Sequence, residues 1–178
     1  RVRAPPREAR HLAALAQLFV RKARDAEDPA FYAQAEDAVR RALDLDARSP
    51  EALQARALLF LQAHRFRDAR DAARALVARS PNADAFGILS DALLELGDYD
   101  GSLDAAQSMI DLRPDGASYV RAAWLRWLHG DVTGAFEAMD LAQDAAPRVP
   151  EAQAWILSQR GYLHWAMGQL DEAARAYE

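Results

Sequence analysis

Apolar runs with helical spacing alternate along the chain with short breaks rich in glycine, proline and aspartate. Three breaks share one form, in which a glycine follows the apolar run: ELGDYD, LHGDVT and AMGQLD place Gly97, Gly130 and Gly168 there. A helix often ends on a residue in the left-handed conformation, which favours glycine. No stretch interrupts the helical pattern with a credible strand. The pattern therefore predicts an all-α chain built from units of helix, tight turn and helix.

Two breaks carry signals for the start of a helix. SPEAL places Ser49 at the N-cap with Pro50 in the first turn, and DPAFY predicts the same arrangement for Asp28 and Pro29.

Pairs of small residues recur with a single spacing. Ala57, Ser90, Ala123 and Gly161 are each followed 12 positions later by a small residue, namely Ala69, Ser102, Ala135 and Ala173. Helices cross closely only where the side chains at the contact are small, so these pairs mark helix crossings. The second members are 33, 33 and 38 residues apart, and Ala35 extends the series backward by 34. A period in this range predicts a stacked helical solenoid.

The repeat resembles the tetratricopeptide repeat (TPR) family, whose unit reads W-x2-L-G-x2-Y, then A-x3-F, then P. The third unit matches at Phe86, Leu89, Ser90, Leu93, Ser102, Ala106 and Pro114, and the fourth at Tyr119, Ala122, Ala123, Ala135, Met139 and Pro147. The resemblance implies a right-handed α-solenoid of antiparallel helix pairs. We expect a single array over residues 1–178, in units of about 9–49, 50–82, 83–115, 116–149 and 150–178, the last incomplete.

Some features depart from the family pattern. The first unit fits if its first helix runs about two turns longer before Asp28, and PEAQAW is expected to add a turn to the first helix of the last unit. Arg126 and His164 stand where an aromatic or large apolar residue is usual, and Arg56 and Arg160 where leucine is usual. These side chains either lay their stems along apolar surface and keep their polar ends in water, or indicate a register shifted by one residue in the fourth and fifth units.

The tryptophans lie beside the predicted core stripe of their helix. On a helical wheel, Tyr119, Ala122, Ala123 and Arg126 share the stripe that faces the partner helices, and Trp124 and Trp127 flank it. In the TPR family this side of the first helix lines the concave surface, so the resemblance implies a groove. The equivalent positions in the neighbouring units are Asp91, Leu94, Tyr162 and Trp165, and Trp155 lies near the start of the last unit.

Buried aromatic residues dominate the energetics of protein interfaces, at about 2 kcal/mol or more each. We therefore expect a peptide or partner helix to bind at Trp124, Trp127, Tyr162, Trp165, Trp155 and Leu94, with Asp91, Glu95 and Arg121 setting its orientation. The acidic positions favour a partner with basic and apolar side chains. The competing interpretation is that the tryptophans are packing residues and the acids form a solvated face. A carboxylate clamp of the family's type is not expected, because the only lysine and asparagine, Lys22 and Asn82, lie off the groove.

Composition excludes several kinds of chemistry. The 178 residues include no cysteine, so disulfides and thiol chemistry are excluded. His11, His64, His129 and His164 lie in separate units without a recognisable metal spacing. We therefore expect a protein that is not an enzyme and has no cofactor or metal. No apolar run approaches the roughly 20 residues that span a bilayer, so direct membrane insertion is not expected.

Charge is distributed unevenly. Before Ala83 the chain has 16 of its 22 basic and 11 of its 27 acidic residues, which gives this part a net charge of +5. The part from Ala83 onward has a net charge of -10. The basic residues are mixed with acids on amphipathic helices, so nucleic-acid binding is not expected. The alternatives to partner binding are head-to-tail self-assembly, which should dissolve by about 0.5 M salt, and service as an accessory domain of a larger protein. The arginine-rich and alanine-rich composition is typical of a bacterial protein from a GC-rich genome. Localisation stays open between cytoplasm and cell envelope, and the resemblance favours export.

Overall fold

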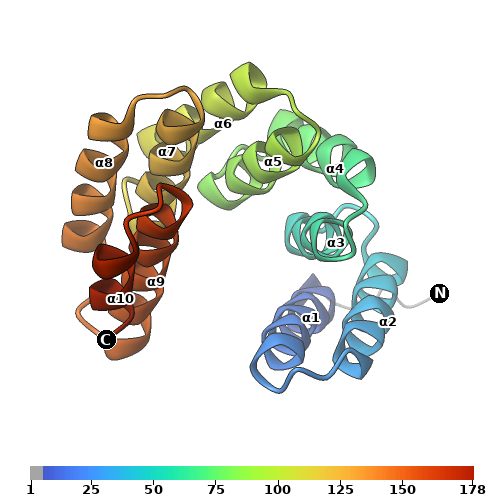
Figure 1. Cartoon of the computed structure of the whole chain (residues 1–178). Helices are drawn as coiled ribbons and strands as arrows, with labels where there is room; N and C mark the ends of the chain where they lie inside the picture. The colour runs from blue at the N-terminus through green and yellow to red at the C-terminus, as the bar shows by residue number, and fades with distance from the viewer. Residues whose placement is uncertain (1–5) are drawn as a thin grey trace. The chain divides into compact units, whose positions relative to one another are not determined.

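The computed structural model describes residues 6–178, which form ten helices and no strand (Figure 1). The prediction of an all-α fold is confirmed. The chain divides into two compact units, the first ending at Asp98 and the second beginning at Tyr99. None of the helices in residues 6–178 has the length and apolar character needed to cross a membrane.

The first unit contains five helices: α1 (Pro6–Asp25), α2 (Ala30–Leu45), α3 (Pro50–Gln62), α4 (Phe66–Arg79) and α5 (Ala83–Glu95). Each packs against the next in sequence, and α3 also packs against α1 and α5. Much of the core where α1, α2 and α3 meet is alanine, together with Val20, Val39 and Leu59. These small side chains let the helix backbones approach closely.

The second unit contains α6 (Tyr99–Leu112), α7 (Gly116–Leu128), α8 (Val132–Ala145), α9 (Pro150–Ala166) and α10 (Leu170–Tyr177). Helix α7 packs against α6, α8 and α9, and α9 also packs against α8 and α10. The largest fully buried side chains of the second unit are Leu125, Met139, Ile156 and Leu163. Helix α7 therefore has helices on several sides, which widens its buried surface.

All nine small residues of the predicted series are buried: Ala35, Ala57, Ala69, Ser90, Ser102, Ala123, Ala135, Gly161 and Ala173. At Gly161 the reason for the small size is visible, because a Cβ there would lie 2.8 Å from ring atoms of Tyr177. The tyrosine ring of α10 thus lies over the backbone of α9 where no side chain intervenes.

The turn glycines adopt the predicted conformation. Gly97, Gly130 and Gly168 have φ values of 78°, 82° and 74°. The turns after α1 and α3 also contain a left-handed residue, but there it is Glu27 or His64, with φ of 51° and 56°. The same turn geometry is therefore built with a residue that carries a Cβ, which is less favourable than glycine.

The two predicted helix starts differ in outcome. The Ser49 side chain accepts a hydrogen bond from the Ala52 backbone N–H at 3.3 Å, and Pro50 is the first residue of α3, as predicted. The prediction for DPAFY is wrong by one residue, since α2 begins at Ala30 and Pro29 precedes it. The Asp28 carboxylate instead accepts a hydrogen bond from the Ala30 backbone N–H at 2.9 Å, which forms an Asx-turn.

The predicted core stripe of α7 is rotated from the observed one. Val120, Ala123 and Leu125 are buried, whereas Tyr119 and Ala122 are only half-buried and Arg126 is exposed. The Arg126 Nη1 lies 2.8 Å from Asp131 Oδ2, so its charge is paired at the surface.

The polar ends of Arg160 and His164 also find partners. Arg160 Nη1 lies 2.5 Å from Asp140 Oδ1, and its guanidinium lies 5.7 Å from the centre of the Phe136 ring. The His164 ring centre is 4.6 Å from that of Phe136, and its Nδ1 is 2.7 Å from Gln169 Oε1. This is the arrangement expected of side chains whose stems cover apolar surface.

Candidate partner-binding site

The start of α7 is fixed by a reciprocal cap. The Asp115 carboxylate accepts from the Ser118 backbone N–H, and the Ser118 hydroxyl accepts from the Asp115 backbone N–H, both at 2.9 Å. Such a capping box satisfies two backbone donors that a helix start otherwise leaves unpaired. It therefore holds the helix that carries Trp124 and Trp127.

Four predicted site residues form a continuous series of ring contacts over α7 and α9, which we call the aromatic ledge: Trp124, Trp127, Tyr162 and Trp165. The ring centres of Trp124 and Trp127 are 5.6 Å apart, nearly perpendicular. Trp124 and Tyr162 are 5.1 Å apart, and Tyr162 and Trp165 are stacked at 5.4 Å. The indole N–H of Trp124 donates to Gln159 Oε1 at 3.3 Å, which further ties α7 to α9.

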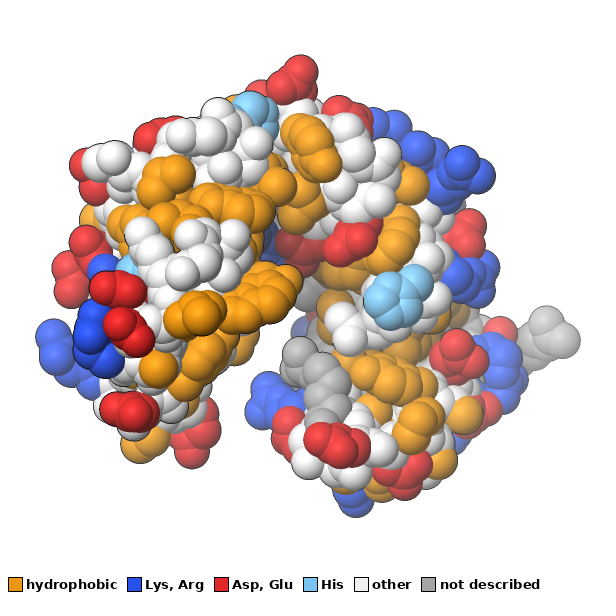
Figure 2. Space-filling model, in the orientation of Figure 1, with side chains coloured by type: hydrophobic (Ala, Val, Ile, Leu, Met, Phe, Trp, Pro, Cys, Tyr) orange, Lys and Arg blue, Asp and Glu red, His pale blue; other side chains and the backbone are white. Residues whose placement is uncertain are grey.

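Burial changes from one end of the aromatic ledge to the other. Trp124 and Trp127 are half-buried and pack against the core of the second unit, whereas Tyr162 and Trp165 are 50% and 55% exposed. Figure 2 shows hydrophobic atoms at the surface in the region of the second unit where Figure 1 draws α7 and α9. The inner two rings thus pack on the core of the second unit and support two outer rings that face solvent, and the role of these rings in binding stays a prediction.

Trp155 and Arg121 lie apart from these ring contacts. Trp155 is 43% exposed in α9, and the described residues give its ring no aromatic neighbour. Arg121 is half-buried on α7, and its Nη1 donates to the Ala117 carbonyl of its own helix at 3.0 Å. The predicted roles of both residues in binding stay predictions.

The acidic site residues belong to the first unit. Asp91 and Glu95 of α5 line a cleft of about 280 Å³ that is also lined by Leu61, Gln62, His64 and Phe66. The edge of the His64 ring meets Phe66, with ring centres 5.5 Å apart. Leu94 is half-buried on the same helix and is not among the residues that line this cleft. The structure therefore brings Asp91 and Glu95 together in one unit and the aromatic ledge together in the other.

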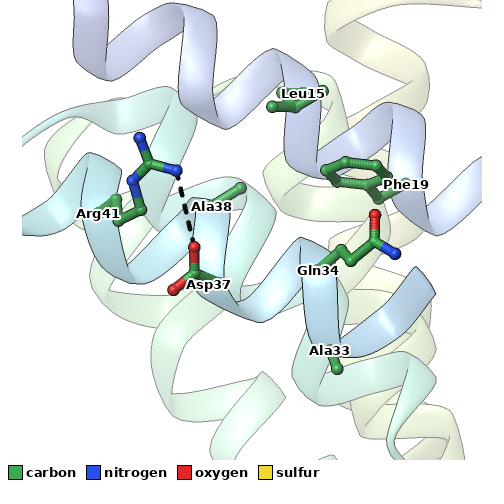
Figure 3. A pocket seen from close by; sticks show the side chains of 7 residues that line it. All are labelled: Leu15, Phe19, Ala33, Gln34, Asp37, Ala38 and Arg41. Carbon is green, nitrogen blue, oxygen red and sulfur yellow. Dashed lines mark ion pairs between the residues drawn. The ribbon is translucent and has the colours of Figure 1, made fainter. Parts of the chain in front are cut away.

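A hollow between α1 and α2 was not predicted from the sequence. It has a volume of about 480 Å³, and Figure 3 shows Leu15 and Phe19 of α1 on one side with Asp37 and Arg41 of α2 on the other. Asp37 Oδ2 and Arg41 Nη1 lie 3.7 Å apart. With Leu12 at the first position of the motif W-x2-L-G-x2-Y, Leu15 and Phe19 take its leucine and tyrosine positions, which indicates burial, yet Leu15 is 39% exposed. No signal in the sequence separates this leucine from a core residue.

The titratable groups of the described chain offer no metal site, and one of them, Asp131, has a shifted pKa. Within residues 6–178, no group of three histidine or acidic side chains is arranged to hold a metal ion. The pKa of Asp131 lies below its usual value, chiefly because the Gly134 backbone N–H donates to the carboxylate, with Arg126 beside it, and partial desolvation opposes the shift. Asp131 is a helix cap, since α8 begins at the next residue.

Comparison with known proteins adds evidence on the family. The model of the tetratricopeptide repeat matches residues 54–117. A search among curated proteins gives no significant match.

Several solved structures share the fold. A thermophilic TPR protein of Thermus thermophilus is 23% identical with a TM-score of 0.76, over 91% of this chain and 88% of that one. PilF of Pseudomonas aeruginosa is 19% identical with a TM-score of 0.68, over 97% and 75%. MamA from Desulfovibrio magneticus RS-1 is 15% identical with a TM-score of 0.61, over 91% and 90%. Likeness at these identities concerns the fold alone.

The family model thus covers α4, α5 and α6 with parts of α3 and α7, and the shared fold extends over almost the whole chain. Residues 54–117 thus resemble the tetratricopeptide repeat, and the chain has the fold of solved TPR proteins.

Proposed function

We propose that this chain is a non-catalytic protein-interaction module that captures a segment of a partner protein on the aromatic ledge. The observation that carries the proposal is the exposed stack of Tyr162 on Trp165, which continues inward to the half-buried Trp124 and Trp127. The TPR fold supports a role in protein interaction generally, and the aromatic ledge is the surface to which we assign that role.

The physical argument is one of area and preorganisation. Tyrosine and tryptophan are large and have few rotatable bonds, so they bury much apolar surface at a small cost in conformational entropy. The rings of the aromatic ledge already contact one another in the free chain, which lowers the cost of ordering them on binding further. An apolar partner side chain lying on Tyr162 and Trp165 would exclude water from both rings.

The chemistry of the partner follows from the same surface. We expect apolar side chains opposite the aromatic ledge, on an extended segment or on one face of a helix. Basic side chains are expected opposite Asp91 and Glu95 of the first unit, since an acidic surface favours an opposite charge in its partner.

The test is affinity capture from the source organism, comparing the wild-type chain with Tyr162→Ala/Trp165→Ala. Leu141→Ala is the matched control, because Leu141 is an equally exposed apolar residue (50%) on α8 of the same unit. We expect a protein that is retained by the wild type and by the control and is lost from the double variant. Titration of that purified partner should show binding weakened about thirtyfold or more in the double variant.

Circular dichroism and thermal unfolding accompany the capture. Because both rings are about half exposed, the double variant should remain helical, with at most a modest fall in melting temperature. A folded double variant that retains the same partners as the wild type would refute the aromatic ledge as the binding surface.

A further inference from the structure

A separate site lies in the first unit, in a cleft of about 350 Å³ between α2 and α3. We call it the basic cleft. Its apolar wall is formed by Val39, Leu43, Leu59 and Phe60. Its volume lies within the range of about 300–1,000 Å³ in which small ligands and single side chains are bound.

Arg56 is the side chain that sets this cleft apart. Its Nε is fully buried without a hydrogen-bond partner, and the described part of the chain offers its guanidinium no hydrogen bond or ion pair. Folded proteins contain few buried donors of this kind, because each loses its hydrogen bonds to water without replacement. The Arg56 side chain as a whole is only half-buried, so an acceptor from outside the chain could meet the rest of this guanidinium and balance its charge.

The other two arginines of the basic cleft already have acidic partners. Arg40 forms ion pairs with Asp37 and Asp44, the latter at 3.6 Å, and Arg65 lies 2.8 Å from Asp68. Arg56 is therefore the cation of this cleft whose charge the chain does not match.

Glu36 also lines the cleft, but no contact of ion-pair length joins it to Arg56 among the described residues. The lining contains three basic and two acidic side chains, and Arg56 is the basic one without an ion pair among the described residues. The sequence points to the same residue, because Arg56 stands where the family pattern has leucine. A guanidinium thus replaces an apolar side chain beside an apolar wall.

We propose that the basic cleft binds a carboxylate carried on an apolar group. The guanidinium of Arg56 presents forked donors that match the two oxygens of a carboxylate, and the apolar wall takes the hydrocarbon part. This carboxylate belongs either to a small organic acid or to an acidic side chain with apolar neighbours in a partner protein. The proposal does not depend on the aromatic ledge, which lies in the other unit.

The experiment titrates the full chain with octanoate and follows backbone amide signals by NMR. Octanamide is the neutral control, and a capped peptide, acetyl-Ala-Leu-Glu-Leu-Ala-amide, represents a partner's side chain. Arg56→Leu removes the guanidinium, and Arg67→Leu is the matched control, since Arg67 is exposed on α4 and does not line the cleft. Arg56→Lys keeps the charge without the fork, and serves if the leucine variant does not fold.

We expect octanoate or the peptide to shift amide signals of α2 and α3, and octanamide to leave them unchanged. Arg56→Leu or Arg56→Lys should weaken this binding about tenfold or more, and Arg67→Leu should not. Binding of octanoate alone assigns the cleft to small acids, and binding of the peptide assigns it to a partner's acidic side chain. The proposal would be overturned if neither octanoate nor the peptide bound. It would also be overturned if octanamide bound as well as octanoate, or if the Arg56 variants bound these ligands as well as the wild type.

Discussion

Asp131 joins the end of α7 to the start of α8. Its carboxylate accepts hydrogen bonds from the Gly134 backbone N–H at 2.9 Å and from Arg126 at 2.8 Å. A Cβ at position 134 would clash with the side chains of both Asp131 and Arg126. Glycine at this position therefore allows the ion pair to lie directly against the first turn of α8.

This arrangement predicts how stability depends on pH. The pKa of Asp131 is lower in the folded chain than in the unfolded one, so the ionised carboxylate stabilises the fold above the usual pKa of aspartate. That contribution should be lost as the pH falls from about 4 through the lowered value. We expect Asp131→Ala to melt at a lower temperature than the wild type at pH 7. The difference between the two melting temperatures, measured by circular dichroism, should be smaller at about pH 2.5. A difference that is constant with pH would contradict this account.

Individual residues were predicted from the sequence where their size alone matters. The spacing of 12 between small residues located buried positions correctly, because a helix crossing tolerates little else at the contact. The surroundings of Arg56 and Arg126 could not be predicted, because tertiary structure alone decides whether a charged residue at an apolar position forms an ion pair with an acidic side chain. The exposure of Leu15 could not be predicted either, because it also depends on tertiary structure.

At the scale of elements, the turns after α5 and α7 depend on backbone conformation and not on packing. Gly97 and Gly130 have positive φ, and a Cβ at either position would meet nothing within 4 Å. We predict that Gly97→Ala and Gly130→Ala each lower the free energy of unfolding by about 1 kcal/mol, from the left-handed conformation alone.

Urea denaturation gives the measurement, and Ala75→Gly, at an exposed position inside α4, provides a comparison in which glycine replaces alanine. Glycine should be the less stable choice there, by about 1 kcal/mol. If alanine at 97 and 130 were as stable as glycine, the turns would have relaxed away from the geometry described.

Helix lengths were predicted well, and exact starts less well. Helix α1 has 20 residues and α9 has 17, against 13 in α3, α5 and α7, which agrees with the expected two extra turns and one extra turn. The start of α2 was misplaced because Asp-Pro fits two local geometries, a helix cap and a short aspartate loop, that share one sequence pattern.

At the scale of the whole molecule, each unit holds one part of the predicted binding surface. The sequence indicated both parts, because tryptophans and acids recur at repeat positions that share a helix face. The continuous ring contacts of the aromatic ledge depend on how α7 packs on α9, which periodicity does not specify. A single groove that joins the two parts, the boundaries of the five repeats and the head-to-tail assembly stay predictions.

The most direct test of the proposed function is photo-crosslinking in cells of the source organism, with benzoylphenylalanine placed at Trp165 or, as the control, at Leu141. Both positions are about half exposed and lie in the second unit, Trp165 on α9 and Leu141 on α8. A difference in crosslinking would therefore reflect where the partner binds and not how exposed the position is. We predict a specific crosslinked partner from position 165 and none from position 141. A partner crosslinked from 141 and not from 165 would show that binding occurs away from the aromatic ledge and would contradict the account.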